Sequence, residues 1–240
     1  MSHEKYLYFS TWGLGRRKCL GVPKTTFGKR WTYCEYCELA CHGADETHPN
    51  TVSLQSYVEA VTKAVLNYPE KVILVGHSMA GIVVSQVAEN LPHRIQRLVY
   101  ISAYLPQDGE DLLSLSKQDS ESLIGFNLEF APDYSVASIK KEVLAEAICA
   151  DASEDFKTML VQYHKAEPTK PLSEAVHLTD AKFGLVEKWY IHSTNDKAVG
   201  YKLQEQMVQA NGKIARTFLL ATSHLPFVVK AQEVFKILIS

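Results

Sequence analysis

Short apolar runs that fit buried strands recur along the chain. The clearest is Val-Ile-Leu-Val within 71–75, and similar runs lie at 98–103, 188–192 and 214–221. An apolar run of this length between polar segments is typical of a strand that is buried on both faces. Near the N-terminus, Lys5-Tyr-Leu-Tyr-Phe predicts a first strand.

Segments with helical spacing separate these strands. Thr51 is a suitable N-cap for the first of these helices, and further helices are predicted over 79–90, 200–210 and 226–239. The apolar positions of the first helix recur at intervals of three and four residues: Val52, Leu54, Tyr57, Val58, Val61, Ala64 and Val65. Strands that alternate with helices predict an α/β fold with a mostly parallel, doubly wound sheet.

Residues 106–183 interrupt the alternation, because they are helix-rich and carry no pattern of a buried strand. Such sheets bind ligands at the carboxyl ends of their strands, and the insertion follows directly after one of them. We therefore expect residues 1–105 and 184–240 to form the core. Residues 106–183 would form a helical cap over that edge.

Composition narrows the class of protein. The 240 residues are 46% hydrophobic and 22% charged, which suits one globular α/β unit. The formal charge of −2 gives no reason to expect nucleic acid or an anionic membrane as a partner. No apolar run approaches the roughly 20 residues that span a bilayer, and the N-terminus lacks the order of a signal peptide. A cytoplasmic location is the expectation.

The end of the 71–75 strand carries the clearest chemical motif. Gly76-His-Ser-Met-Ala-Gly81 fits G-x-S-x-G, in which a serine stands on a sharp turn between strand and helix. Ser78 is the predicted nucleophile, because this turn exposes its hydroxyl above the sheet. The main-chain N–H of Met79 is the predicted oxyanion donor, and His77 is expected to pack beneath the turn rather than react.

A serine nucleophile needs a base and an acid that orients the base. Asp196 follows the 188–192 strand and His224 follows the 214–221 strand, so both side chains are expected at the edge where Ser78 lies. The order serine, acid, histidine is the one found after such a turn. Asp180 is the competing acid. The spacing thus predicts a triad of Ser78, Asp196 and His224.

Several motifs together resemble the methylesterase and hydroxynitrile lyase branch of the α/β-hydrolases. They are the Gly76–Gly81 motif, Gly43-Ala-Asp, Tyr104-Leu-Pro, the Thr194–Lys197 turn and Ser223-His224. The likeness runs from about residue 42 to 240. It implies an α/β-hydrolase fold with a small helical cap and no cofactor. The lyases of this branch carry a lysine directly after the catalytic histidine, where this chain has Leu225.

The stretch 9–41 departs from that branch, which has a His-Gly oxyanion loop and a second strand there. A reading of the stretch shifted by one nucleotide, with allowed codons, recovers His-Gly, two tryptophans, Gly-His-x-Val and Leu-Pro in order. We hypothesise a one-base frameshift that is repaired near Cys41. DNA sequencing that finds no compensating pair of indels would contradict it. As printed, the stretch is expected to be irregular and to lack the second oxyanion donor.

The end of this stretch and the residue after it form a candidate zinc cluster of Cys34, Cys37, Cys41 and His42, since three thiolates and an imidazole suit tetrahedral zinc. Under the frameshift hypothesis this cluster is accidental, and no metal is expected.

The sequence predicts a serine hydrolase that cleaves small carboxylic esters and acts on a small molecule, with a homodimer as a candidate assembly. The alternatives are a hydroxynitrile lyase on the same scaffold, or a binding-only or impaired relative. Seven residues of the insertion are candidates to line an acyl or aryl pocket, although most of them would equally serve packing: Leu112, Leu113, Leu123, Phe126, Phe130, Leu160 and Tyr163.

Overall fold

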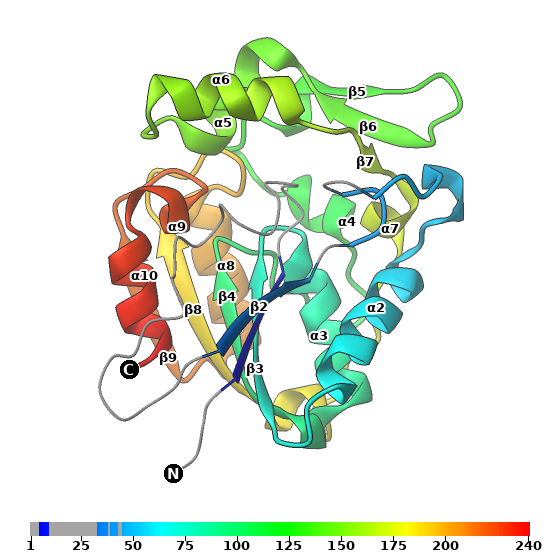
Figure 1. Ribbon diagram of the computed structural model, residues 1–240, viewed down its shortest axis with the longest axis vertical. Coiled ribbons are helices and arrows are strands. Elements are labelled where there is room, and N and C mark those ends of the chain that lie inside the picture. Colours follow the sequence, from blue (N-terminus) through cyan, green and yellow to red (C-terminus); the bar gives the residue numbers. More distant parts are fainter. Residues whose placement is uncertain (1–4, 10–32, 38, 43–44) are drawn as a thin grey trace.

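The computed structural model describes residues 5–9, 33–37, 39–42 and 45–240, the first two ranges by backbone alone. Six parallel strands form one sheet in the order β2-β1-β3-β4-β8-β9 (Figure 1). They are β1 (Lys5–Phe9), β2 (Tyr33–Cys37), β3 (Val72–His77), β4 (Ile95–Ile101), β8 (Glu187–Ser193) and β9 (Arg216–Leu220). The predicted parallel α/β sheet is confirmed.

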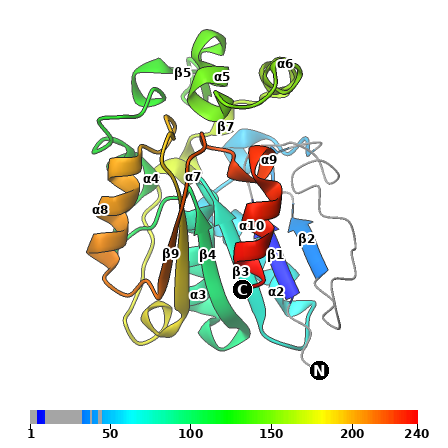
Figure 2. The same ribbon diagram turned by 90° about the vertical axis from the view of Figure 1, so that its left-hand side faces the viewer.

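Helices cover both faces of this sheet (Figure 2). On β3, Val72 and Leu74 pack with α2 (Leu54–Leu66), α3 (Ala80–Asn90) and α8 (Tyr201–Asn211). Ile73 and Val75 point the other way, toward α9 (Pro226–Val229) and α10 (Ala231–Leu238). Because successive side chains of a strand alternate between faces, a strand covered on both sides is apolar throughout.

Two predicted helix boundaries change in the structure. Thr51 ends a short 3-10 helix, η1 (Pro49–Thr51), and Ser53 is the true N-cap of α2. The Ser53 hydroxyl accepts a hydrogen bond from the Ser56 amide, and the Ser56 hydroxyl accepts one from the Ser53 amide. This capping box makes Ser53, rather than Thr51, the residue at which α2 begins. The helix predicted over 226–239 breaks at Lys230, whose φ of −127° and ψ of 40° are not helical.

Strand β2 lies within the stretch that was expected to be irregular. It runs parallel to β1 with Tyr33 opposite Lys5 and Cys37 opposite Phe9. The expectation is wrong for these five residues, because two tyrosines in a five-residue run give enough strand propensity to extend the sheet edge. Residues 10–32, with the frameshift hypothesis and the second oxyanion donor, fall outside the described part of the chain.

The insertion lies above the carboxyl ends of the strands (Figure 1). It includes α4 (Leu112–Ser116), η3 (Gly125–Asn127), α5 (Lys141–Cys149), α6 (Glu154–Tyr163), α7 (Lys170–Ser173) and, where it returns to the core, η4 (Phe183–Leu185). A helix-rich segment without a buried strand was predicted here, and the segment also contains a small antiparallel sheet of β5 (Leu128–Phe130), β6 (Val136–Ile139) and β7 (Glu167–Pro168). These strands lack a buried apolar run because β5 is mostly exposed.

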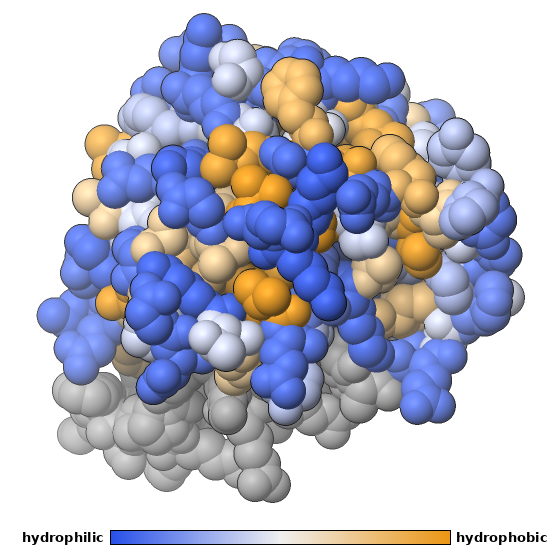
Figure 3. All heavy atoms as spheres, turned by 90° about the horizontal axis from the view of Figure 1, so that it is seen from above, coloured by the Kyte–Doolittle hydropathy of each residue, from blue (hydrophilic) through white to orange (hydrophobic). Residues whose placement is uncertain are grey.

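The outer surface of this insertion mixes polar side chains with separate apolar ones (Figure 3). The large apolar side chains exposed on it are Phe126, Phe130, Tyr134 and Tyr163. Within the described part of the chain, no helix is both long and apolar enough to cross a membrane.

A further 3-10 turn, η2 (Pro92–Arg94), leads into β4.

Gly81 marks the closest approach of α3 to the loop after β4. A Cβ atom at this position would lie 2.1 Å from the carbonyl oxygen of Tyr104 and 3.0 Å from Cβ of Ala103. Gly81→Ala is therefore expected to lower the free energy of unfolding by about 2–3 kcal/mol through overpacking. Urea unfolding measures this. Gly125→Ala is the control, since nothing lies within 4 Å of its Cβ position, and equal midpoints for both variants would contradict the packing argument.

Candidate active site

Ser78 occupies the sharp turn that its motif predicts. Strand β3 ends at His77 and α3 begins at Ala80, so only two residues make the turn. Ser78 has a φ of +57°, a left-handed conformation that is uncommon for serine and that collects at functional sites. The amides of Gly81 and Tyr104 both donate to the Ser78 carbonyl at 3.1 Å, which holds the strained backbone in place.

The sheet topology places this turn where α/β sheets bind ligands. From β1, the chain moves to β2 on one side and then to β3 on the other. Ser78 follows β3 at the carboxyl edge, beside this reversal of strand order. Such a switch point leaves a crevice between loops that diverge in opposite directions.

Asp196 and His224 form a buried pair at the same edge. Nδ1 of His224 lies 2.7 Å from Oδ2 of Asp196, and both side chains are inaccessible to solvent. The second oxygen, Oδ1, accepts the main-chain N–H groups of Ala198 at 2.7 Å and Val199 at 3.0 Å. Burial raises the pKa of Asp196 above its ordinary value, against the bonds from His224 and the two amides, which favour the carboxylate. The pair fixes one orientation of the imidazole.

His77 joins the Ser78 turn to the His224 loop. Its Nε2 lies 2.8 Å from the His224 carbonyl oxygen, and the two rings lie tilted against each other with centroids 4.5 Å apart. Because a carbonyl only accepts, His77 carries its proton on Nε2. Burial holds the pKa of His77 well below its usual value, which keeps the ring neutral. Ser78 is the residue next to His77, so these contacts bring the nucleophile and the histidine loop together.

The competing acid, Asp180, lies elsewhere. Its side chain is 89% exposed, and Oδ1 accepts a bond from the Lys213 ammonium at 2.6 Å. Two residues that the sequence reasoning missed support the pair instead. Gln204 of α8 donates to Oδ2 of Asp196 at 3.2 Å, and Asp151 accepts both the amide and the hydroxyl of Ser223. Gln204 could have been noticed as a polar residue on the buried side of its helix.

Met79 is the N-cap of α3 and is buried next to Ser78. The first N–H groups of a helix have no partner within the helix and point out of its N-terminus. The oxyanion role of the Met79 amide stays a prediction.

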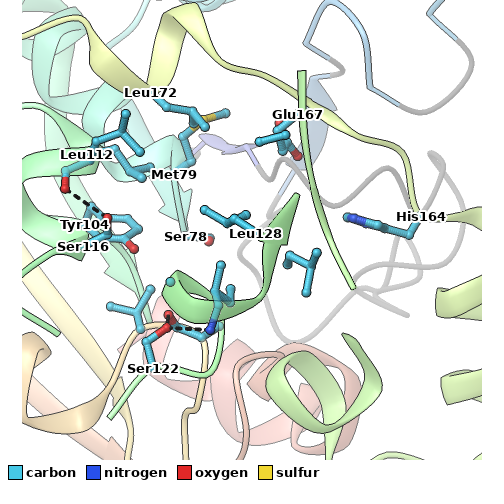
Figure 4. Close-up of a pocket in the computed structure, with 17 residues that line it drawn as sticks. Ser78, Met79, Tyr104, Leu112, Ser116, Ser122, Leu128, His164, Glu167 and Leu172 are labelled. Atoms are coloured by element: carbon cyan, nitrogen blue, oxygen red, sulfur yellow. Dashed lines mark hydrogen bonds between the residues drawn. The ribbon is translucent and has the colours of Figure 1, made fainter. Parts of the chain in front are cut away.

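A cavity of about 90 Å³ opens over Ser78 and Met79 beneath the insertion (Figure 4). That is several times the space of one water molecule, so the cavity has room for a small organic group. Two of the seven predicted lining residues, Leu112 and Leu113, line it. Among the others, Leu160 is buried elsewhere in the core and Phe126 is 89% exposed. The apolar lining residues not foreseen are Tyr104, Ile124, Leu128, Ala137, Ile139, Leu172, Ala198 and Val199.

The zinc hypothesis is not supported at His42. Its Nδ1 faces the Ala40 carbonyl at 2.9 Å and its Nε2 faces Glu167 at 2.8 Å, so both ring nitrogens are engaged. Cys41 Sγ donates to the Thr47 carbonyl at 2.7 Å. The side chains of Cys34 and Cys37 lie outside the described residues. Among those that the structure does describe, no three histidine, cysteine or acidic residues could hold a metal ion.

Comparison with known proteins identifies the family. A sequence profile of the alpha/beta hydrolase family matches residues 29–237. The chain belongs to this family. "Putative methylesterase 14, chloroplastic" of Arabidopsis thaliana is 28% identical over 215 residues, which cover 84% of this chain and 62% of the relative. Methyl jasmonate esterase 1 of Vitis vinifera is 25% identical over 207 residues, covering 80% of this chain and 79% of that protein.

The solved structures agree with the fold of this hydrolase. Polyneuridine aldehyde esterase superposes with a TM-score of 0.81 at 16% sequence identity, over 99% of this chain and 98% of that one. The resemblance to methylesterases and the α/β-hydrolase fold are thereby confirmed. The chain spans about three fifths of the length of the Arabidopsis methylesterase it matches. The division into core and cap, the cytoplasmic location and the homodimer stay predictions.

Proposed function

We propose that this α/β-hydrolase is a serine esterase that cleaves small carboxylic esters through an acyl-enzyme. One observation carries the proposal: the buried Asp196–His224 pair contacts the strained turn of Ser78 through His77. A histidine held by a carboxylate next to a serine that lines a cavity is the arrangement that activates a nucleophile. The methylesterase names of its relatives point to the same class of substrate.

In the proposed reaction, the Ser78 hydroxyl attacks the ester carbonyl and Nε2 of His224 takes its proton. Asp196 accepts Nδ1–H of His224, which leaves Nε2 unprotonated as the base. The same carboxylate stabilises the imidazolium that forms. The Met79 amide stabilises the oxyanion, and a single donor of this kind lowers the barrier by about 3–4 kcal/mol. His224 returns the proton to the leaving alcohol, and water then hydrolyses the acyl-enzyme by the reverse sequence of proton transfers.

The lyase alternative has less support. Leu225, which follows His224, is buried and packs with Ile73, Val75 and Phe227 in the core cluster on the α10 side of the sheet. An apolar side chain at this position supplies no positive charge to hold a cyanide ion. The residues therefore favour hydrolysis.

Release of methanol from methyl esters of small carboxylic acids tests the proposal, together with covalent labelling by a fluorophosphonate. We expect turnover, and a mass increase of one probe on the peptide that contains Ser78. Labelling without turnover would indicate an impaired relative. Neither labelling nor turnover would indicate a binding-only protein, and cyanide release from a cyanohydrin would indicate the lyase.

A further inference from the structure

The cavity over Ser78 has one polar side. Most of its lining is apolar, and the hydroxyls of Ser116 and Ser122 already donate to the carbonyls of Leu113 and Ala198. Among the described residues of the lining, the titratable side chains are those of Tyr104, of Glu167 on β7 and of His164, and Figure 4 shows Glu167 and His164 on the side away from Tyr104. Burial lowers the pKa of His164, so its ring is neutral at pH 7.

The Glu167 carboxylate is held in place by a histidine from the core. His42 faces the Ala40 carbonyl with Nδ1 and Oε2 of Glu167 with Nε2, and these partners only accept. Both nitrogens must therefore carry a proton, which makes His42 an imidazolium. Burial disfavours its charge, but Glu167 and the Ala40 carbonyl outweigh burial and raise the pKa of His42. The hydroxyl of Tyr57 donates to the same carbonyl at 3.2 Å and completes the network.

Stability alone gives little reason for this ion pair. The His42 side chain is 4% exposed, and a buried ion pair is often no more stable than apolar residues of the same size. The Glu167 side chain is 23% exposed to solvent. A carboxylate offers about four acceptor sites, and His42 occupies one of those on Glu167. In an otherwise apolar cavity, the remaining sites suit a donor on a bound molecule.

We propose that Glu167, positioned by His42, is a substrate-binding residue that selects esters carrying a hydroxyl or ammonium group. This inference rests on the proposed esterase function. The apolar wall would hold the hydrocarbon part of the substrate, and the donor would bind the carboxylate. A substrate whose group next to Glu167 is only a hydrogen-bond acceptor would be disfavoured, because that group and the carboxylate repel each other.

The test compares methyl phenylacetate with derivatives that bear a 3-hydroxyl, a 4-hydroxyl, a 4-aminomethyl or a 4-acetyl group. For the wild-type protein, we expect kcat/KM for the best donor-bearing ester to exceed that of the parent by roughly 10- to 100-fold, as expected for a hydrogen bond to a charged group. The acetyl derivative, which only accepts, should fall below the parent.

Glu167→Gln separates recognition from folding. Without the carboxylate, burial favours a neutral His42 that keeps its Nδ1–H on the Ala40 carbonyl. Its Nε2 would then accept the amide NH2 of the glutamine, and the uncharged amide oxygen would face the cavity. The aminomethyl ester should lose at least about tenfold in kcat/KM relative to the parent, because its ammonium group no longer meets a charge, whereas the ratio for the acetyl ester should change little. Loss of packing alone would lower kcat/KM for all the esters together and would not single out the ammonium. Glu129→Gln, on the exposed strand β5 of the same small sheet, is the matched control and should leave every ratio unchanged.

The outcomes distinguish the two proposals. If the wild-type protein cleaves none of these esters and fluorophosphonate does not label Ser78, the esterase function fails and the inference falls with it. If kcat/KM for methyl phenylacetate equals that for the donor-bearing esters, or the aminomethyl ester keeps its wild-type advantage in Glu167→Gln, the role of Glu167 is overturned while the esterase function stands.

Discussion

Ser78→Ala is expected to lower kcat for ester hydrolysis by at least about 10³-fold and to abolish labelling by fluorophosphonate. The loss of a serine nucleophile leaves only the rate that binding and the oxyanion donor provide. Alanine and serine adopt the left-handed backbone at similar cost, so the turn with φ of +57° should persist and stability should change little. Initial rates with a methyl ester and thermal unfolding measure both effects.

The control for Ser78→Ala is Ser173→Ala, at an exposed serine of α7 whose hydroxyl donates to the Lys170 carbonyl. Its rate should match the wild type. A Ser78→Ala protein that folds and keeps more than about a tenth of the wild-type rate would remove Ser78 from the proposed role.

Asp196→Asn is expected to lower kcat by roughly 10³- to 10⁴-fold. Oδ1 of Asp196 accepts two main-chain amides, and an asparagine meets this demand only with its carbonyl oxygen. Its NH2 group must then face Nδ1 of His224, which forces the proton of the imidazole onto Nε2. In that tautomer Nε2 no longer accepts the Ser78 proton. The same assay measures the loss, with thermal unfolding to verify the fold.

Asp180→Asn is the matched control, because Asp180 was the rival acid in the sequence. It is exposed and paired with Lys213, so its replacement should change the rate by less than about twofold. If Asp180→Asn lost activity while Asp196→Asn kept it, the proposed triad would be wrong.

The insertion contacts the rest of the chain at the proposed specificity site. His42 belongs to the core loop before α2, whereas Glu167 belongs to β7 of the small sheet above. At the opposite end, Asp151 follows α5 and binds Ser223, the residue before His224. The insertion is therefore tied to the core on both sides of the cavity, once through a wall residue and once through the histidine loop.

Local sequence was sufficient for five of the six strands of the large sheet and for the turn of Ser78. An apolar run that ends in Gly-His-Ser-Met-Ala-Gly determines both the buried strand β3 and the close helix after it, because only glycine fits beside Val84 and Tyr104. The positions of Asp196 and His224 at strand ends followed from the order of elements, since parallel strands bring their carboxyl ends to one edge. The N-cap at Ser53 was missed because Thr51 offered a similar cap two residues earlier. The break at Lys230 was also missed.

Only the tertiary structure decided between residues that look alike in sequence. Asp180 and Asp196 are both aspartates in polar turns, and packing alone buries one against His224 and exposes the other. By sequence, Phe126 was as suitable for the cavity as Leu112, yet Leu112 lines the cavity and Phe126 is exposed on η3. The His42–Glu167 pair joins residues 125 positions apart. Hydrophobic periodicity records which face of an element is buried but not which distant residue lies against it, so these contacts came from the fold.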